Sequence, residues 1–578
     1  MCGIFGGVGV SEQEARTALE HIHRGDDGIT VSSYGDVVLG SRRHLVKVSN
    51  KQGVGAGQSD QPYDSDLRPV SLVFNGEFYN FAEHKAGHLK DASFRTEGDT
   101  EVFLKLYESE GIDFLFRRDI DSMFALGILD RELNKLYLTR DWPGRVPVFY
   151  YYDKDDRTFL FSSQLSGLRT LDRVDLNTAE ELVPGCYLTL DLDTFELEAT
   201  QYYRAKPIKK DQELLDIGRE LHQRLHRSAR NRTMGDVPIC TMLSGGIDSL
   251  MTTYYVLSNI DFGSVSYQPT SYVFAVEGFD SPDVQRARIA AAGLKDIGLI
   301  HKEVYAPAEQ LIEDIPEIIT LFEMRHIKAL SVYPLPIYYY LAPVMRADGF
   351  KVTIGGHGVD ELLGAYDNWK ELNKPHQVQS TFLARQVFIN NIWENMMRRA
   401  SIIFMERGPI EARFPFLQPD VCEYLLGVDP KWLTITPHNA ELMLELIAER
   451  GGPRAGWGEN LSWTHDYLVQ YLDGGGRPPA EFDPAWRTEV EKLFWKFPLM
   501  VAGMHAAAES SLPFSLLFNA KLRGQHGAGI SSLEPRIVER YSELGSTDIE
   551  IYRAIVAKAF RLRNDWFDKP AGQLRSTG

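Results

Sequence analysis

The sequence predicts an α/β protein of two parts (α+β overall), a sheet-rich N-terminal part followed by a larger part built on a parallel sheet. Three observations lead to this fold class. The chain has 578 residues, too many for one hydrophobic core. Its first two hundred residues alternate short apolar segments with turns, and the residues that follow alternate strand and helix signals. We therefore expect one domain over residues 1–205 and a second over 206–578, with 568–578 as a flexible tail.

Short strands dominate the first part. Many of them, with few long helical patterns, predict two stacked sheets. The segments expected to be strands are 37–39, 70–74, 123–129, 135–138, 148–152, 159–161 and 186–190.

The second part opens after a linker, predicted at 202–211 from its proline and three lysines. Apolar residues then recur at helical spacing from Leu214 to Leu225, which predicts an amphipathic helix. Alternating signals follow, and they favour a parallel α/β core. Strands are expected at 237–242, 271–276, 298–304 and 351–354, and helices at 250–257 and 284–292.

Charge and composition exclude several classes of function. A net charge of −18 argues against a nucleic-acid partner. The four cysteines are too few and too scattered for a disulfide framework or a zinc site. No apolar run approaches the length of a membrane span, and no signal segment begins the chain, so we expect a soluble, cytoplasmic protein with no membrane partner. A homodimer is compatible with the sequence, which does not determine the oligomeric state.

The heptad LSGGIDS, residues 243–249, lies between a predicted strand and a predicted helix. In this arrangement backbone N–H groups and a helix N-terminus bind an anion such as a phosphate. Asp248 would repel a phosphate unless Mg²⁺ lay between them. The alternative is an ordinary strand-to-helix turn with an acid near the helix N-terminus, and no GxxxxGK[ST] string occurs in the chain.

A second Gly-rich turn, residues 355–361, also follows a predicted strand and also ends in carboxylates. Open α/β sheets bind ligands at the carboxyl ends of their strands, so the two turns are expected to face each other across a nucleotide. Asp248 and Asp360 would then share Mg²⁺. Taken alone, the second turn could equally be a helix N-cap carrying two acids.

Cys2 is the candidate nucleophile of the first part. Removal of Met1 would expose the α-amino group of Cys2, whose pKa lets it accept the thiol proton. The alternative is a small residue near a frayed terminus. Asn75 and Gly76, at the end of a predicted strand, could donate to an oxyanion. Arg42 or Arg43 could pair with a substrate carboxylate and Asp99 with an α-ammonium, although singly such charges are usually solvated.

Together these motifs resemble the N-terminal-nucleophile glutaminase domain of the asparagine synthetase family. The matching strings, in order, are MCGIFG, QP at 61–62, NGEFYN, GDTE, DSMFALGILD and FSSQLSGL. The resemblance implies an αββα sandwich in which Cys2 attacks a glutamine amide and Asn75 and Gly76 form the oxyanion hole. The family usually has His-x-Arg-Leu where this chain has SRRHL at 41–45, so the arginine is Arg43 or Arg42. The residues implied to bind glutamine are Arg43, Asn75, Gly76, Glu77 and Asp99.

The second part resembles the ATP-pyrophosphatase synthetase domain of the same family, through LSGGIDS, FAVEGFDSPD, GGHGVDELLGAY and EARFPFL. The resemblance implies that MgATP adenylates an acceptor carboxylic acid, that ammonia from glutamine forms an amide, and that AMP and pyrophosphate leave. Lys521 would stabilise the leaving pyrophosphate, although it could be a surface lysine, and Asn519 replaces a family arginine. The residues implied to contact ATP are Leu243, Ser244, Gly245, Gly246, Asp248, Ser249, Val276, Gly355 and Gly356.

His357 departs from the family. Asparagine synthetases usually have an acid at this position, and the β-lactam-forming members usually have tyrosine. A histidine can act as a base or donate to an anionic acceptor, or it can be a neutral substitution that only bonds within the loop. We include His357 among the catalytic candidates and leave open whether the acceptor is aspartate or another acid.

Four other functions compete with this interpretation. Ring-closing members of the family need no ammonia, so the intact Cys2 argues against them, but an amidotransferase of specialised metabolism stays open. A non-catalytic glutamine or nucleotide sensor would not need Cys2, Asp248, Asp360 and Lys521 together. The charge of −18 argues against an enzyme acting on transfer RNA.

Overall fold

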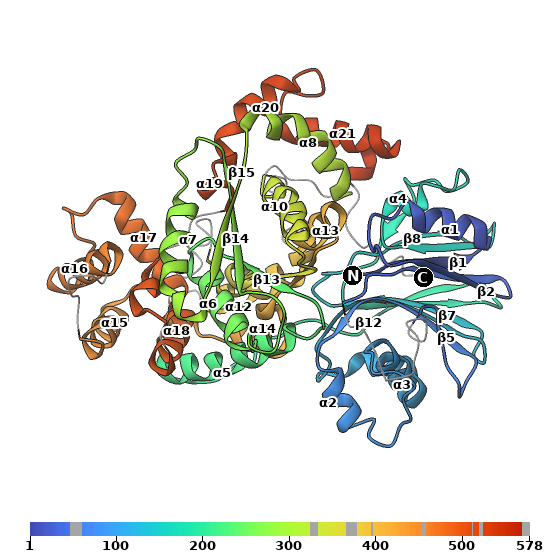
Figure 1. The fold of residues 1–578 in the computed structure, drawn as a ribbon, viewed down its shortest axis with the longest axis horizontal. Helices are drawn as coiled ribbons and strands as arrows, with labels where there is room; N and C mark the ends of the chain where they lie inside the picture. The colour runs from blue at the N-terminus through green and yellow to red at the C-terminus, as the bar shows by residue number, and fades with distance from the viewer. Residues whose placement is uncertain are drawn as a thin grey trace.

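Two antiparallel sheets, stacked face to face, form the N-terminal part of the protein (Figure 1). The structure is a computed structural model and describes residues 1–46, 60–323, 333–365, 378–394, 397–451, 458–510, 512–519 and 524–568. In the first sheet the strand order is β10 (Glu180–Glu181), β8 (Phe149–Asp153), β9 (Thr158–Ser162), β1 (Gly3–Val8), β3 (Val37–Arg42) and β2 (Ile29–Tyr34). In the second it is β12 (Leu197–Gln201), β11 (Cys186–Asp191), β7 (Lys135–Arg140), β6 (Ser122–Asp130), β5 (Val70–Phe78) and β4 (Tyr63–Asp64).

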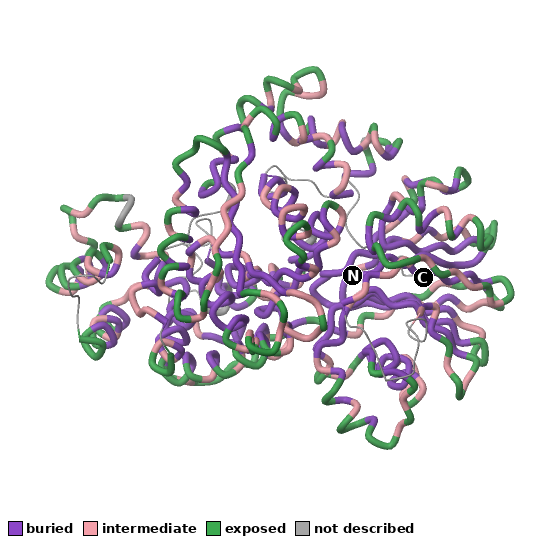
Figure 2. Tube along the Cα trace, in the orientation of Figure 1, coloured by how far each residue is buried: buried purple, intermediate pink, exposed green. Residues whose placement is uncertain are grey.

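Helices cover the outer face of each sheet. On the first sheet lie α1 (Glu12–Glu20) and α4 (Leu165–Leu168), and on the second lie α2 (Phe81–Ala86) and α3 (Thr100–Glu110). A buried apolar layer fills the space between the sheets, as Figure 2 shows. The αββα sandwich is therefore confirmed. Six of the seven predicted strand segments fall within strands, and the seventh, 148–152, begins one residue before β8.

The second part is built on a parallel sheet with strand order β15-β14-β13-β16-β17. These strands are β13 (Ile239–Met242), β14 (Thr270–Val276), β15 (Ile300–Ala306), β16 (Val352–Ile354) and β17 (Glu411–Arg413), and every neighbouring pair is parallel. The chain adds β14 and β15 on one side of β13 and β16 and β17 on the other. The switch point, where such sheets bind ligands, therefore lies between β13 and β16.

Helices pack around this sheet and continue to the end of the described chain. The first group is α5 (Leu214–Arg232), α6 (Ile247–Ser258), α7 (Pro282–Gly293), α8 (Ala308–Phe322), α10 (Leu335–Ala347) and α11 (Val359–Leu363). The second is α12 (Val378–Asn390), α13 (Met397–Arg407), α14 (Pro419–Leu426), α15 (Pro437–Glu449), α16 (Glu459–Asp473), α17 (Pro484–Trp495), α18 (Phe497–Glu509), α19 (Gly524–Gly527), α20 (Glu534–Arg540) and α21 (Asp548–Phe560).

Two details of the predicted elements need comment. The strand expected from Gly298 begins at Ile300, because Gly298 adopts a left-handed conformation that ends the preceding turn. Residues 569–578, most of the expected flexible tail, lie outside the described residues. None of the described helices is long and apolar enough to cross a membrane.

Candidate functional site

Cys2 lies immediately before β1, buried where the two parts of the protein meet. The backbone N–H of His44 donates to its Sγ at 3.3 Å, so the loop after β3 holds the thiol in place. Burial raises the pKa of the Cys2 thiol, although the nearby α-amino group opposes the shift. The thiol therefore needs a base before it can act as a nucleophile at neutral pH.

Asn75 and Gly76 lie on β5, in the sheet opposite Cys2. The Asn75 side-chain amide donates to Ser163 Oγ at 3.2 Å, and the same hydroxyl accepts from Ile4 N–H at 2.9 Å. Ser163 thus joins the strand after Cys2 to the candidate oxyanion donor. Gly76 has φ +148°, and a Cβ there would lie 2.0 Å from Met123 O, so only glycine fits.

The two adjacent arginines have different partners. The Arg42 guanidinium donates to backbone carbonyls at the end of α1 and beyond, at Leu19, Glu20, Ile22 and Gly25. Arg43 instead pairs with Asp60. Since Arg42 is committed to these carbonyls, the geometry favours Arg43 as the residue that holds a substrate carboxylate.

Asp99 and Glu77 bring two buried carboxyl groups to the same region. Asp99 Oδ2 accepts from Phe78 N–H at 2.8 Å, and burial raises the pKa of Asp99. Burial also raises the pKa of Glu77 well above its usual value, and the carboxylates of Glu411 and Asp99 add to the effect. A buried acidic pair of this kind suits an ammonium ligand, whose charge would offset the repulsion.

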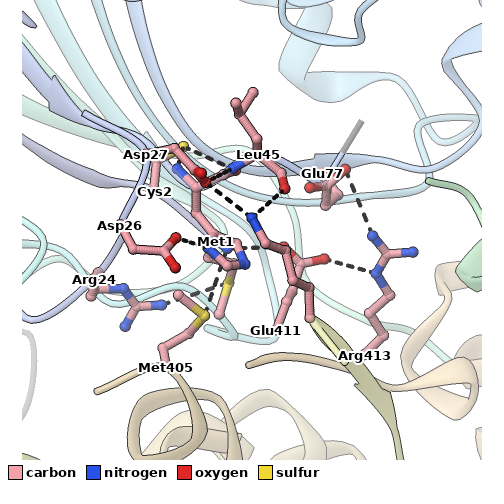
Figure 3. A network of polar contacts seen from close by, with 12 residues as sticks. Met1, Cys2, Arg24, Asp26, Asp27, Leu45, Glu77, Met405, Glu411 and Arg413 are labelled. Carbon is pink, nitrogen blue, oxygen red and sulfur yellow. Dashed lines mark hydrogen bonds and ion pairs between the residues drawn. The ribbon is translucent and has the colours of Figure 1, made fainter. Parts of the chain in front are cut away.

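The α-amino group beside Cys2 contacts the second part directly. In the structure this group belongs to Met1, and it pairs with Glu411 Oε2 at 3.1 Å, with both groups fully buried. Figure 3 shows Glu411 between this amine and Arg413, whose Nε donates to Glu411 Oε1 at 2.7 Å. Burial alone would raise the pKa of Glu411, but these two cations lower it to about 2.

The strand that carries Glu411 also reaches the second Gly-rich turn. Arg413, at the other end of β17, accepts a hydrogen bond at its carbonyl from Gly355 N–H, at 3.0 Å. Its guanidinium lies 3.9 Å from Glu77 Oε2. A three-residue strand therefore contacts both the surroundings of Cys2 and the turn that begins at Gly355.

The two Gly-rich turns lie side by side, as their order in the sequence predicts. β13 and β16, which precede them, are neighbours in the parallel sheet. A Cβ on Gly356 would lie 2.7 Å from Asp248 O, so the absence of a side chain at Gly356 allows the turns to touch. Within the first turn Ser249 Oγ accepts from Ser244 N–H and donates to Gly246 O, which fixes the loop. The remaining expected ATP contacts, Leu243, Gly245 and Val276, also lie at the carboxyl ends of β13 and β14.

Lys496 lies between the two acidic residues of these turns. Its ammonium, at the start of α18, pairs with Asp248 and also with Asp360 Oδ1 at 2.8 Å. The lysine is buried, and burial lowers its pKa while Asp248 opposes the shift. The sequence predicted that Asp248 and Asp360 share Mg²⁺. In the structure both carboxylates contact the ammonium group of Lys496.

The same carboxylates fit Mg²⁺. They are hard oxygen ligands from two adjoining turns, and Asp248 Oδ1 is buried without a hydrogen-bond partner among the described residues.

His357 has an aromatic environment. Its Nε2 lies 2.9 Å from the Tyr338 hydroxyl, and its ring packs edge-on against Phe414 with centroids 4.9 Å apart. Tyr338 in turn contacts Phe404. The Tyr338 hydroxyl and the Phe414 ring therefore both contact the His357 imidazole.

Comparisons with known proteins agree with this geometry. A model of the glutamine amidotransferase domain matches residues 1–204, and one of asparagine synthase matches 220–403. Together they span most of the chain. The chain belongs to the asparagine synthetase family.

Relatives in this family are distant but matched over most of their length. Glutamine-hydrolysing asparagine synthetase B of Escherichia coli (strain K12) is 26% identical over 452 residues, 75% of this chain and 76% of that protein. Asparagine synthetase 2 of Oryza sativa subsp. japonica is 26% identical over 447 residues, covering 75% and 71%. The solved structure of glutamine phosphoribosylpyrophosphate amidotransferase from B. subtilis matches at 16% identity over 45% of this chain and 64% of that one. Its TM-score is 0.28, which says nothing about how the parts are arranged.

The late part of the chain, where Lys521 was expected to act, is only partly described by the structure. Lys521, the expected pyrophosphate lysine, lies outside the described residues. Its neighbour Asn519 is described, and its amide donates to Gly245 O at 3.2 Å, so this segment does reach the phosphate turn. The sequence did not predict Lys496 as a site residue, because the helix before it, α17, carries no recognisable motif. The available signal was a lysine directly before the apolar helix α18.

Proposed function

We propose that this chain hydrolyses glutamine at Cys2, adenylates an acceptor carboxylate with MgATP, and converts the acceptor to an amide. The products are glutamate, AMP, pyrophosphate and the amide. One observation carries the proposal: Arg413 on β17 reaches both sites, with its guanidinium 3.9 Å from Glu77 Oε2 and its carbonyl accepting a hydrogen bond from Gly355 N–H. Three strand residues span about 10 Å, so ammonia released at Cys2 would have a short internal path to the acceptor.

In the first half-reaction the Cys2 thiol attacks the glutamine amide carbon. Asn75 Nδ2 and Gly76 N–H would stabilise the oxyanion, Arg43 would hold the α-carboxylate, and the Asp99–Glu77 pair would hold the α-ammonium. Collapse of the intermediate expels ammonia and leaves a thioester, which water hydrolyses to glutamate.

In the second half-reaction an acceptor carboxylate oxygen attacks the α-phosphorus of ATP and displaces pyrophosphate. Bound Mg²⁺ would neutralise phosphate charge between Asp248 and Asp360. Lys496 places a positive charge at the same point, and we propose that it stabilises the leaving pyrophosphate together with Lys521. Ammonia then attacks the acyl carbon and AMP leaves.

Aspartate is the first acceptor to test, because the named relatives are asparagine synthetases. A second candidate, an amidotransferase acting on a less polar acid, is favoured by the surroundings of His357. Phe414 packs against the His357 ring, and Tyr338, which also contacts His357, packs against Phe404, so aromatic surface borders this position.

The test is a panel of carboxylic acids incubated with MgATP and glutamine, scored for pyrophosphate release and for the mass of the amide. Glutamine-dependent amide formation with at least one acid is the expected result. Glutamine hydrolysis without acid-dependent pyrophosphate release, across aliphatic, aromatic and amino acids, would contradict the proposal. Highest turnover with aspartate would exclude the second candidate.

A further inference from the structure

Two acids of the N-terminal part, Asp26 and Asp27, bind cations of the second part. Arg346 Nη2 lies 2.5 Å from Asp26 Oδ2, and Lys351 Nζ lies 3.2 Å from Asp27 Oδ2. Figure 3 shows both acids beside the N-terminus, close to Cys2. We call these four residues the interdomain latch.

The latch also holds the loop that positions Cys2. Asp26 Oδ1 bonds to His44 Nδ1 at 3.0 Å, and Asp27 Oδ2 accepts from Leu45 N–H at 2.6 Å. Lys351 Nζ donates to Leu45 O at 3.2 Å. Because His44 N–H is the group that donates to Cys2 Sγ, a shift of Asp26 or Asp27 would move the amide that orients the thiol.

A metal ion at this cluster is disfavoured. Asp26, Asp27 and His44 present ligand atoms within 4.8 Å of one another. Both carboxylates, however, already pair with cationic side chains, and a divalent ion would have to displace Arg346 and Lys351. The cluster is therefore an ion-pair network between the two parts of the protein.

The other ends of α10 and of the strand after Lys351 meet at the second Gly-rich turn, residues 355–361, which we call the acceptor loop because it carries His357. Arg346 lies near the end of α10, and Tyr338 lies eight residues earlier on the same helix, about 12 Å away along its axis. Lys351 directly precedes β16, which leads through Gly355 to His357. The hydrogen bond between Tyr338 and His357 joins helix and strand at the acceptor end.

We propose that Tyr338 and Arg346 are positioning residues through which α10 couples the acceptor loop to Cys2. The inference rests on the proposed function, since it needs glutamine hydrolysis at Cys2. A change at the Tyr338–His357 hydrogen bond displaces α10, and the displacement reaches the Cys2 thiol through Arg346, Asp26 and the His44 amide. Such coupling would make glutamine hydrolysis respond to the state of the acceptor site.

A double-mutant cycle on the full chain tests this inference, with glutamate formation from glutamine as the assay. Tyr338→Phe keeps the ring and removes the hydroxyl that contacts His357. We expect it to lower kcat/KM for glutamine about threefold, and Arg346→Gln to lower it about tenfold, mainly through kcat. The double variant is expected to match Arg346→Gln alone, because the signal from Tyr338 passes through Arg346.

If the two substitutions acted independently, kcat/KM of the double variant would fall about thirtyfold, because the free-energy effects of residues this far apart usually add. That result would overturn the inference, as would a Tyr338→Phe rate within twofold of the unmodified protein. Arg288→Gln, which removes an exposed pair with Glu303, is the matched control and should leave the rate unchanged. Melting temperatures confirm that each variant folds. If the unmodified protein does not hydrolyse glutamine, the proposed function itself fails, an outcome separate from loss of coupling.

Discussion

The carboxylate of Glu411 lies 3.1 Å from the α-amino nitrogen of Met1, across 410 positions of sequence. Both groups are buried, so the ion pair forms only when the two parts of the chain pack together. Because Met1 directly precedes Cys2, the contact places Cys2 beside β17, the strand that also contacts the second Gly-rich turn. Arg413 on the same strand lies 3.9 Å from Glu77, a contact that does not depend on Met1, so β17 joins the two sites also when Cys2 is the first residue.

Lys496 should be essential for adenylation and dispensable for glutamine hydrolysis. Lys496→Met leaves Asp248 and Asp360 facing each other in a buried site, which costs about 3–5 kcal/mol of stability when no cation replaces the lysine. We expect acid-dependent pyrophosphate release to fall at least a hundredfold, and Mg²⁺ to recover part of the lost melting temperature. Lys492→Met, on the preceding helix α17, is the control. Unchanged pyrophosphate release in Lys496→Met would remove this lysine from the site.

Gly356→Ala tests the contact between the two Gly-rich turns. The added Cβ would approach Asp248 O to 2.7 Å, a backbone contact that cannot be relieved by a side-chain rotation. The turns must separate, so we expect KM for ATP in the synthetase assay to rise more than tenfold while glutamine hydrolysis changes little. Gly263→Ala, in an exposed turn, should behave as the unmodified protein. Normal ATP affinity in Gly356→Ala would mean that nucleotide binds elsewhere.

Asn75 and Ser163 should differ in their kinetic signatures. Asn75→Ala removes a candidate oxyanion donor, which typically costs about 3 kcal/mol, so kcat for glutamine hydrolysis should fall at least a hundredfold with KM nearly unchanged. Ser163→Ala removes only the partner that orients the Asn75 amide and should lower kcat less. Equal losses, or a loss confined to KM, would show that Asn75 binds substrate rather than the transition state.

His44 should make the protein sensitive to acid. Burial lowers the pKa of His44 to about 4, below the value of about 6.5 in an unfolded chain. Above pH 6.5 both states are neutral, and as the pH falls toward 4 only the unfolded state takes up the proton, so stability falls. From pH 7 to pH 5 the loss is about 2 kcal/mol.

The matched variant is His44→Gln, which retains a donor for Asp26 and cannot titrate. Its melting temperature should fall less than that of the unmodified protein between the same two pH values. Equal falls would show that His44 is already protonated in the folded protein.

Local patterns were sufficient to predict several elements of the fold. Apolar runs between Val37 and Leu190 mark strands that the two stacked sheets bury. Both Gly-rich turns also follow apolar strands. The approach of the two Gly-rich turns was expected, because parallel strands bring their carboxyl ends to one edge, but the direct contact of Gly356 with Asp248 was not. These features depend on short stretches of sequence.

The contacts that complete the site join distant segments and had no local signal. Lys496 reaches Asp248 across 248 positions, from a region without a recognisable motif. Asp26 and Asp27 appear in the sequence as an ordinary acidic turn, and only the packed structure pairs them with Arg346 and Lys351. The choice between Arg42 and Arg43 likewise needed the carbonyls at the end of α1.

Cys2→Ala, assayed with glutamine and with ammonium as alternative nitrogen donors, tests the central claim most directly. The acid that gives the highest turnover in the carboxylate panel serves as acceptor, and amide mass and AMP are measured for both donors. We predict that glutamine-dependent amide formation disappears while ammonium-dependent formation keeps most of its rate, because only the first half-reaction uses the thiol. Equal loss with both donors, or full retention with glutamine, would contradict the division of chemistry between the two sites.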